Sequence, residues 1–180
     1  GMLVRGLTDH PGRLIGVGRD RGLEIHKSIR IAAPVEKVFE FFSDPVQMGG
    51  LLPYINRAEP LGDGRVRWHL EGPAGVGHVA FDERIVESVE NERMVWESGP
   101  DAPVRYAGET RFQPDGDGTR VDLRFVYSPP GGMVADAAAS VFGLDPKTLF
   151  DRSLNRIKHH LEEGTIPQGA SDDAVREHRG

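Results

Sequence analysis

One carboxylate of this sequence is spaced so that it could serve as an acid or a base inside a folded domain. Glu83 falls on the same alternation phase as Phe81 and Ile85, so in a regular strand its side chain points to the apolar side with theirs. A carboxyl group in that position would be held neutral or paired, which suits proton transfer. A β-bulge that turns Glu83 outward, or a place at the open end of the sheet, is the more ordinary interpretation.

Aromatic side chains on apolar strand faces, together with one before the final helix, form a second set of candidates: Trp68, Phe81, Trp96, Tyr106, Phe112, Phe125, Tyr127 and Phe142. They either line a pocket for a flat or hydrophobic ligand or form an ordinary core. For any single residue, a place in the core is the commoner outcome. Tyr106 and Tyr127 favour the pocket, because a buried hydroxyl needs a partner that a ligand or water supplies. Glu83 and these two tyrosines are weak catalytic candidates, and the catalytic residues themselves stay unknown.

The sequence lacks the residues that several common catalytic and cofactor sites require. The chain has no cysteine, which excludes a thiol nucleophile, a disulfide and a cysteine–zinc site. The seven histidines do not show zinc-ligand spacing, and His69 and His78 fall on the solvent phases of their strands. The glycines from Gly16 to Gly22 neither follow a strand nor open a helix, so they are not a dinucleotide loop. We therefore expect no metal and no cofactor.

Charge and hydropathy narrow the partner classes. The net charge is −6 with both signs interspersed, and no basic stripe is present, so a nucleic-acid partner is not expected. No apolar run approaches the roughly 20 residues of a membrane span, and no secretory signal is recognised. These features predict a cytoplasmic protein. The 180 residues suit one domain of about 140 residues with two extensions.

The elements that must position the candidates begin with a strand over Glu24–Ile31. A helix follows from Pro34 and ends at Asp44-Pro45, because proline disfavours helix in the residue before it. A short helical turn is expected near Val46–Leu51. The first helix buries one face at i, i+3, i+4 and i+7 spacing, made of Val35, Val38, Phe39 and Phe42.

Turn signals at regular spacing then separate a series of alternating segments: Tyr54–Leu61, Arg65–Glu71, Gly77–Val89, Arg93–Ser98, Val104–Gln113 and Thr119–Ser128. The connections are too short for crossovers, so the strands form an antiparallel meander. One face is apolar and aromatic and the other, which includes Glu109, is charged and solvated. A final helix from Asp145-Pro146 to Gly164 covers the apolar face, and Met133–Phe142 forms a helical piece poor in bulk before it.

This order of elements, with the segment Ile31-Ala-Ala-Pro-Val-Glu-Lys-Val-Phe39, resembles the polyketide cyclase/dehydrase family of the START-like, Bet v 1-like (SRPBCC) superfamily. Gly72–Gly75, Tyr127–Gly132 and Phe142-Gly143 are similar to a bacterial subgroup of it. The resemblance implies an α+β helix-grip fold of order β-α-α-β6-α. In that fold a curved antiparallel sheet of about seven strands wraps around a long C-terminal helix and leaves a cavity between them.

The resemblance implies a ligand-binding domain over residues 23–163, between an N-terminal arm of residues 1–22 and a tail of residues 164–180 that is expected to be disordered. Superfamily members bind lipids, quinones or polyketides, and some are cyclases or aromatases. The first hypothesis is therefore a carrier or sensor of a small hydrophobic molecule, and the second is a polyketide cyclase or aromatase. A third is an interaction module that uses the arm to bind a partner or to form a homodimer.

Overall fold

The computed structural model describes residues 23–52, 54–71, 77–128 and 146–164. The predicted arm of residues 1–22, the helical piece Met133–Phe142 and the tail from residue 165 lie outside these ranges. The described elements follow the order β1, α1, α2, β2 to β7 and α4. This order agrees with the arrangement predicted from the sequence.

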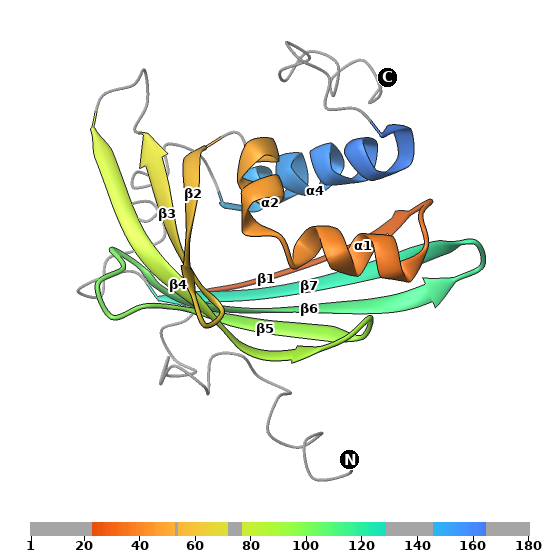
Figure 1. The fold of residues 1–180 in the computed structure, drawn as a ribbon, viewed down its shortest axis with the longest axis horizontal. Helices are drawn as coiled ribbons and strands as arrows, with labels where there is room; N and C mark the ends of the chain where they lie inside the picture. Colours follow the sequence, from red (N-terminus) through yellow and green to blue (C-terminus); the bar gives the residue numbers. More distant parts are fainter. Residues whose placement is uncertain (1–22, 53, 72–76, 129–145, 165–180) are drawn as a thin grey trace, which may run out of the picture.

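Seven antiparallel strands form one sheet in the order β1-β7-β6-β5-β4-β3-β2. Every strand after β1 pairs with its neighbour in the chain, and β1 closes the series by pairing with β7. The strands are β1 Leu23–Ile31, β2 Ile55–Gly62, β3 Arg65–Glu71, β4 His78–Val89, β5 Arg93–Ser98, β6 Arg105–Asp115 and β7 Gly118–Ser128. The sheet bends so that β2, β3 and the start of β4 rise beside the helices (Figure 1).

Two short helices, α1 Val35–Phe42 and α2 Pro45–Leu51, follow β1. They are separated where the sequence predicted a break, and the predicted turn near Val46–Leu51 is a helix. Asp44 begins α2, because its Oδ1 accepts hydrogen bonds from the backbone N–H groups of Val46 and Gln47 at 3.0 and 3.3 Å. Proline at the next position lacks only an N–H that the first helical turn leaves unpaired anyway.

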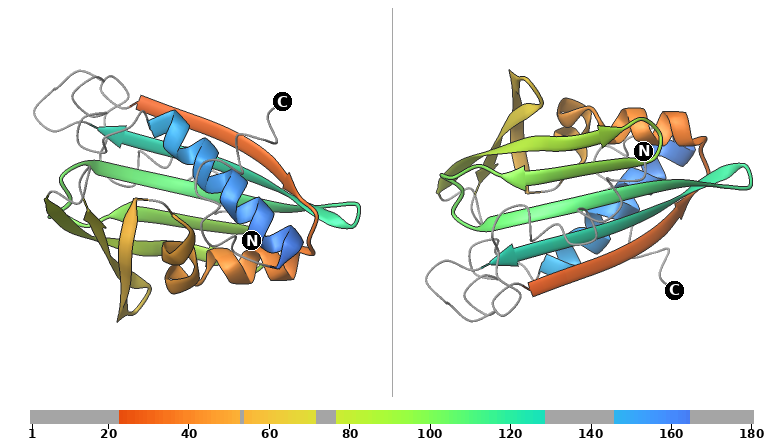
Figure 2. Two further views of the ribbon diagram at one scale, coloured as in Figure 1. Left: turned by 90° about the horizontal axis from the view of Figure 1, so that it is seen from above. Right: turned by 90° about the horizontal axis from the view of Figure 1, so that it is seen from below.

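All described helices lie on the concave side of the sheet (Figure 1). Helix α4, Pro146–Glu163, runs diagonally across the strands (Figure 2). Its buried residues include Leu149, Leu154, Ile157 and Leu161. The C-terminal half of α4 packs with α1 and the ends of β1, β6 and β7 in one large core cluster. Smaller clusters on β3 and around Tyr106 and Phe125 occupy the other end of the sheet.

The outer face of the sheet departs from the expected solvated surface at its centre. Glu109, on β6, is only 1% exposed, and the Nε of Arg111 donates to its Oε1. The register places Glu109 between Val95 and Arg124 on the neighbouring strands. The expectation that Glu109 is solvated is therefore wrong, because alternation fixes the side to which a residue points but not what surrounds it there.

Candidate ligand cavity

A cavity of about 390 Å³ lies between the concave face of the sheet and the helices α2 and α4. Strands β2 to β7 and all three described helices contribute side chains to its wall. Most of the lining is aliphatic or aromatic, as in ordinary small-molecule pockets.

Six of the eight aromatic residues predicted as ligand contacts line this cavity: Trp68, Phe81, Trp96, Tyr106, Phe125 and Tyr127. Phe112 does not, because it lies further along β6 in the large core cluster. Its ring packs edge to face with Phe39 and Phe42 at centroid distances of 5.3 and 5.4 Å. Phe142 lies outside the described residues.

Glu83 points into the cavity with Phe81 and Ile85. The register is regular between β3 and β4 and pairs Glu83 with Val66. On the β5 side Glu83 pairs with Ser98, and the irregularity of β4 comes only after Ile85. The irregularity thus lies beyond Glu83 and does not turn its side chain outward, so the bulge favoured from the sequence is wrong as an account of Glu83.

The Glu83 carboxylate is enclosed by neutral groups. The Tyr106 hydroxyl donates to its Oε1 at 3.0 Å. Burial raises the pKa of Glu83 to about 7, while hydrogen bonds from Tyr106 and the Trp68 side chain act in the opposite direction. The side chain keeps part of its surface against the cavity, so water there moderates the shift. The Glu83 carboxyl group therefore keeps its proton to a higher pH than an exposed glutamate does.

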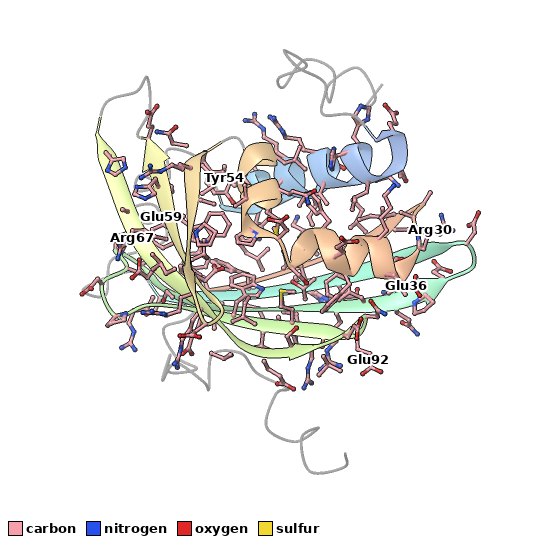
Figure 3. All side chains as sticks on the ribbon, viewed as in Figure 1. Arg30, Glu36, Tyr54, Glu59, Arg67 and Glu92 are labelled. Carbon is pink, nitrogen blue, oxygen red and sulfur yellow. The ribbon has the colours of Figure 1, made fainter. Side chains whose placement is uncertain are left out.

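Two tyrosine hydroxyls face the same region as Glu83. Burial raises the pKa of Tyr106 well above its usual value of 10.0, and the neighbouring Glu83 raises it further. Burial raises the pKa of Tyr54 to about 12, opposed by a hydrogen bond with Ser153. Tyr54 lies beside α2 and β2 (Figure 3). Both hydroxyls therefore stay protonated, and the single O–H donor of Tyr106 is already used by Glu83.

Tyr54 and Ser153 were not predicted as site residues. Tyr54 was predicted to begin the segment Tyr54–Leu61, but the structure starts β2 at Ile55 and leaves Tyr54 just before it. Ser153 gave a usable signal: it lies three residues after Phe150 and directly before Leu154, on the apolar face of α4. Its hydroxyl donates to the Leu149 carbonyl at 2.7 Å. Because Ser153 is a polar residue on the apolar face of the covering helix, the sequence could have identified it as part of the cavity wall.

One glycine shapes the aromatic wall. Gly108 lies opposite Trp96 in the register of β5 and β6. A Cβ at this position would lie 2.0 Å from the Trp96 ring, so the indole lies directly on the glycine backbone. The Trp96 ring in turn lies 5.6 Å from Phe125, whose ring is 4.7 Å from Phe150 on α4. The missing side chain thus lets a row of rings extend from the sheet to the helix.

Residues 23–162 match the family described as polyketide cyclase / dehydrase and lipid transport. The chain belongs to this family. The match includes every strand of the sheet and nearly all of α4, so the seven-stranded sheet and its covering helix form the family's helix-grip fold. No protein with a curated description matches the chain.

Solved structures similar to this polyketide cyclase/dehydrase family member include a protein from Deinococcus radiodurans, 25% identical, with a TM-score of 0.61 over 79% of this chain and 100% of that one. The Zhui aromatase/cyclase from a Streptomyces species is 19% identical, with a TM-score of 0.64 over 83% of this chain and 99% of that chain. A START superfamily protein from Mycobacterium smegmatis is 15% identical, with a TM-score of 0.63 over 79% and 99%. The last two likenesses concern the fold alone.

Two histidines of this family member come together outside the cavity, although the sequence suggested no cluster. His69 and His78 stack with ring centroids 5.3 Å apart, and Glu59 lies 3.0 Å from the Nε2 of His69. Figure 3 shows Glu59 at the β2–β3 end of the sheet.

Within the described ranges, no group of three or more histidine or acidic side chains is arranged to hold a metal. None of the helices in those ranges is long and apolar enough to span a bilayer.

Proposed function

We propose that the protein binds a small hydrophobic molecule, such as a lipid, a quinone or a polyketide-like compound, in the cavity between the sheet and α4. The observation that carries this proposal is a cavity of about 390 Å³ lined by predominantly apolar side chains. The aromatic residues Trp68, Phe81, Trp96, Tyr106, Phe125 and Tyr127 are the proposed ligand contacts. The cytoplasmic location and a homodimer stay predictions from the sequence.

The cavity is partly open, so water or a ligand can enter it. At roughly 24 cal/mol per Å³, keeping about 390 Å³ dry and empty would lower the free energy of unfolding by about 9 kcal/mol. That is comparable to the whole stability of an ordinary domain, about 5–15 kcal/mol. Water is a poor filling, because it needs two to four polar partners and most of this wall offers none. An apolar ligand would avoid both the cost of an empty cavity and the cost of water molecules without polar partners.

The test compares a variant that fills the cavity with a matched control on the same strand. Ile85 lines the cavity, whereas Val79 lies on the same alternation phase of β4 but is 40% exposed and outside the cavity. Ile85→Trp narrows the cavity, so it should reduce the thermal stabilisation of the protein by hydrophobic compounds and the amount of any copurifying molecule seen by mass spectrometry. Val79→Trp should leave both unchanged. Equal ligand binding by wild type and Ile85→Trp would contradict the proposal.

A second candidate function is a cyclase or aromatase acting on a polyketide-like chain. The Glu83–Tyr106 pair favours it, because a carboxyl group with a pKa of about 7 lies 3.0 Å from a hydroxyl at the cavity wall. The Glu83 carboxylate would take a proton from a carbon between two carbonyls. The resulting carbanion would then attack a carbonyl of the same chain, and Tyr106 or Tyr127 would protonate the new alkoxide. The proton taken up by Glu83 would then return to the tyrosinate, for Tyr106 through their hydrogen bond.

The enzyme candidate is tested with a poly-β-ketone thioester as substrate. Glu83→Gln and Tyr106→Phe should each lower the rate of ring formation by about 100-fold or more, the usual contribution of general acid–base groups. Tyr127→Phe tests the alternative proton donor. Undiminished ring formation in Glu83→Gln and Tyr127→Phe would rule out this mechanism without touching the binding proposal.

A further inference from the structure

The cavity contains an acidic group, Glu83, for which the described residues provide no cationic partner. Glu83 is the single acidic side chain of the described cavity wall, and Arg65 is the single basic one. Arg65 is exposed and acts on Asp82, whose pKa it helps to lower on the outer face of the sheet. No ion pair found among the described residues includes Glu83, and the side chains that shift its pKa are the neutral Tyr106 and Trp68.

Aromatic rings surround the same carboxyl group. Phe81 lies two residues before Glu83 on β4, and Trp68 on β3 pairs with Phe81 in the register. The Tyr106 ring stands edge to face with Phe81 and with Trp96, at centroid distances of 5.8 and 5.9 Å. Ring faces attract a cation through their negative quadrupole, most strongly where water is excluded. A carboxylate among such rings has the chemistry of an ammonium site.

We infer that the cavity takes a hydrophobic amine, with the ammonium group on the Glu83 carboxylate and the apolar body among the rings of the wall. This inference rests on the proposed binding function and specifies the head group of the ligand. The ammonium supplies the cation that the carboxylate lacks in its apolar surroundings, so the pair is formed within one enclosed space. A ligand carboxylate or phosphate would instead meet a like charge at Glu83, and Arg65, the basic residue of the described wall, is exposed and lies near Asp82.

The hydrogen-bond arrangement also favours a donating head group over an accepting one. Tyr106 donates to Oε1 of Glu83, so the charged carboxylate still has lone pairs for an N–H donor of the ligand. A neutral carbonyl would need the protonated form of Glu83 as its donor. The two ligand classes therefore respond to pH in opposite directions. Amine binding strengthens as Glu83 loses its proton, and carbonyl binding weakens.

The experiment is isothermal titration calorimetry with three compounds that share a naphthyl group: 2-(1-naphthyl)ethylamine, 2-(1-naphthyl)ethanol and 1-naphthaleneacetate, which has one methylene fewer. At pH 8 the amine should bind at least tenfold more tightly than the alcohol, and the acetate should bind most weakly. Between pH 8 and pH 5.5 the amine should lose affinity by up to roughly 30-fold, because its aliphatic ammonium stays charged while Glu83 becomes protonated.

Two variants assign the preference to Glu83. Glu83→Gln should make the amine and the alcohol bind alike at both pH values. Asp82→Asn removes the same charge from the adjacent residue, whose carboxylate pairs with Arg67 at 2.7 Å, and should keep the amine preference.

The possible results separate this inference from the proposed function. Alcohol binding as tight as amine binding at pH 8, or an amine preference that survives Glu83→Gln, would overturn the inference. In either case the proposed function would still stand if the alcohol bound to wild type but bound poorly to Ile85→Trp. Failure of all three compounds to bind wild type would count against both.

Discussion

Replacing Glu83 by glutamine should stabilise the protein in alkaline solution and leave its stability nearly unchanged in acid. Glutamine has the shape of the protonated carboxyl group, and it can accept the Tyr106 hydroxyl that now donates to Oε1 at 3.0 Å. It carries no charge at any pH. The variant therefore removes the penalty of a carboxylate in an apolar wall and keeps the hydrogen bond.

The magnitude follows from the two pKa values of Glu83. Its pKa rises from 4.5 to about 7 in the folded protein, so the folded state holds the proton more tightly than the unfolded state. The stabilisation from this group is complete below pH 4.5 and is lost as the pH rises through 7. At about 1.4 kcal/mol for each tenfold change in proton affinity, the loss is slightly more than about 3 kcal/mol. Cavity water lowers that figure.

The assay is urea unfolding of wild type and Glu83→Gln at pH values from 4.5 to 8. The difference in free energy of unfolding should be small at pH 4.5, grow steadily, and approach 3 kcal/mol in favour of the variant at pH 8. Asp82→Asn is the control, since the Asp82 pKa is lowered by Arg67 and its stabilisation is lost only in stronger acid. A constant difference across this pH range, or a variant less stable at pH 8, would refute the reasoning.

Three further predictions concern stability. Gly108→Ala should cost about 1–3 kcal/mol and change Trp96 fluorescence, because a Cβ would lie 2.0 Å from the indole; an unchanged spectrum would contradict this packing. Asp44→Ala should cost about 1 kcal/mol in urea unfolding through the loss of the α2 cap, and Asp44→Ser should recover most of it. Thr119→Val should cost about 1–3 kcal/mol in the same assay, because the buried hydroxyl donates to the Ala33 carbonyl at 2.8 Å; a neutral effect would mean that another donor replaces it.

Much of the fold could be predicted because its signals are local. Asp44-Pro45 breaks the chain between two helices through proline sterics and the capping carboxylate. The turns between strands are short, so each strand pairs with the next and the meander follows. The pairing of β1 with β7 joins residues about a hundred positions apart. That contact leaves no local signal, and only the family resemblance implied it.

The candidate site was harder to predict, because its residues depend on register and on neighbours. The direction of Glu83 depended on whether the irregularity of β4 lay before or after it, and alternation cannot place a bulge. Phe112 has the same alternation phase as Tyr106, yet it lies where α1 closes the core instead of beside the cavity. Glu109 showed the same limit on the outer face, where its surroundings rather than its phase decide its burial.

The central claim is that the space under α4 holds a hydrophobic guest, and a crystal structure with 2-(1-naphthyl)ethylamine tests it most directly. The account predicts electron density for the naphthyl rings between the Trp96–Tyr106 wall and Phe150, with the amine nitrogen within hydrogen-bonding distance of Glu83. Naphthyl density only on the outer surface, or a cavity closed by inward movement of these aromatic side chains, would contradict it.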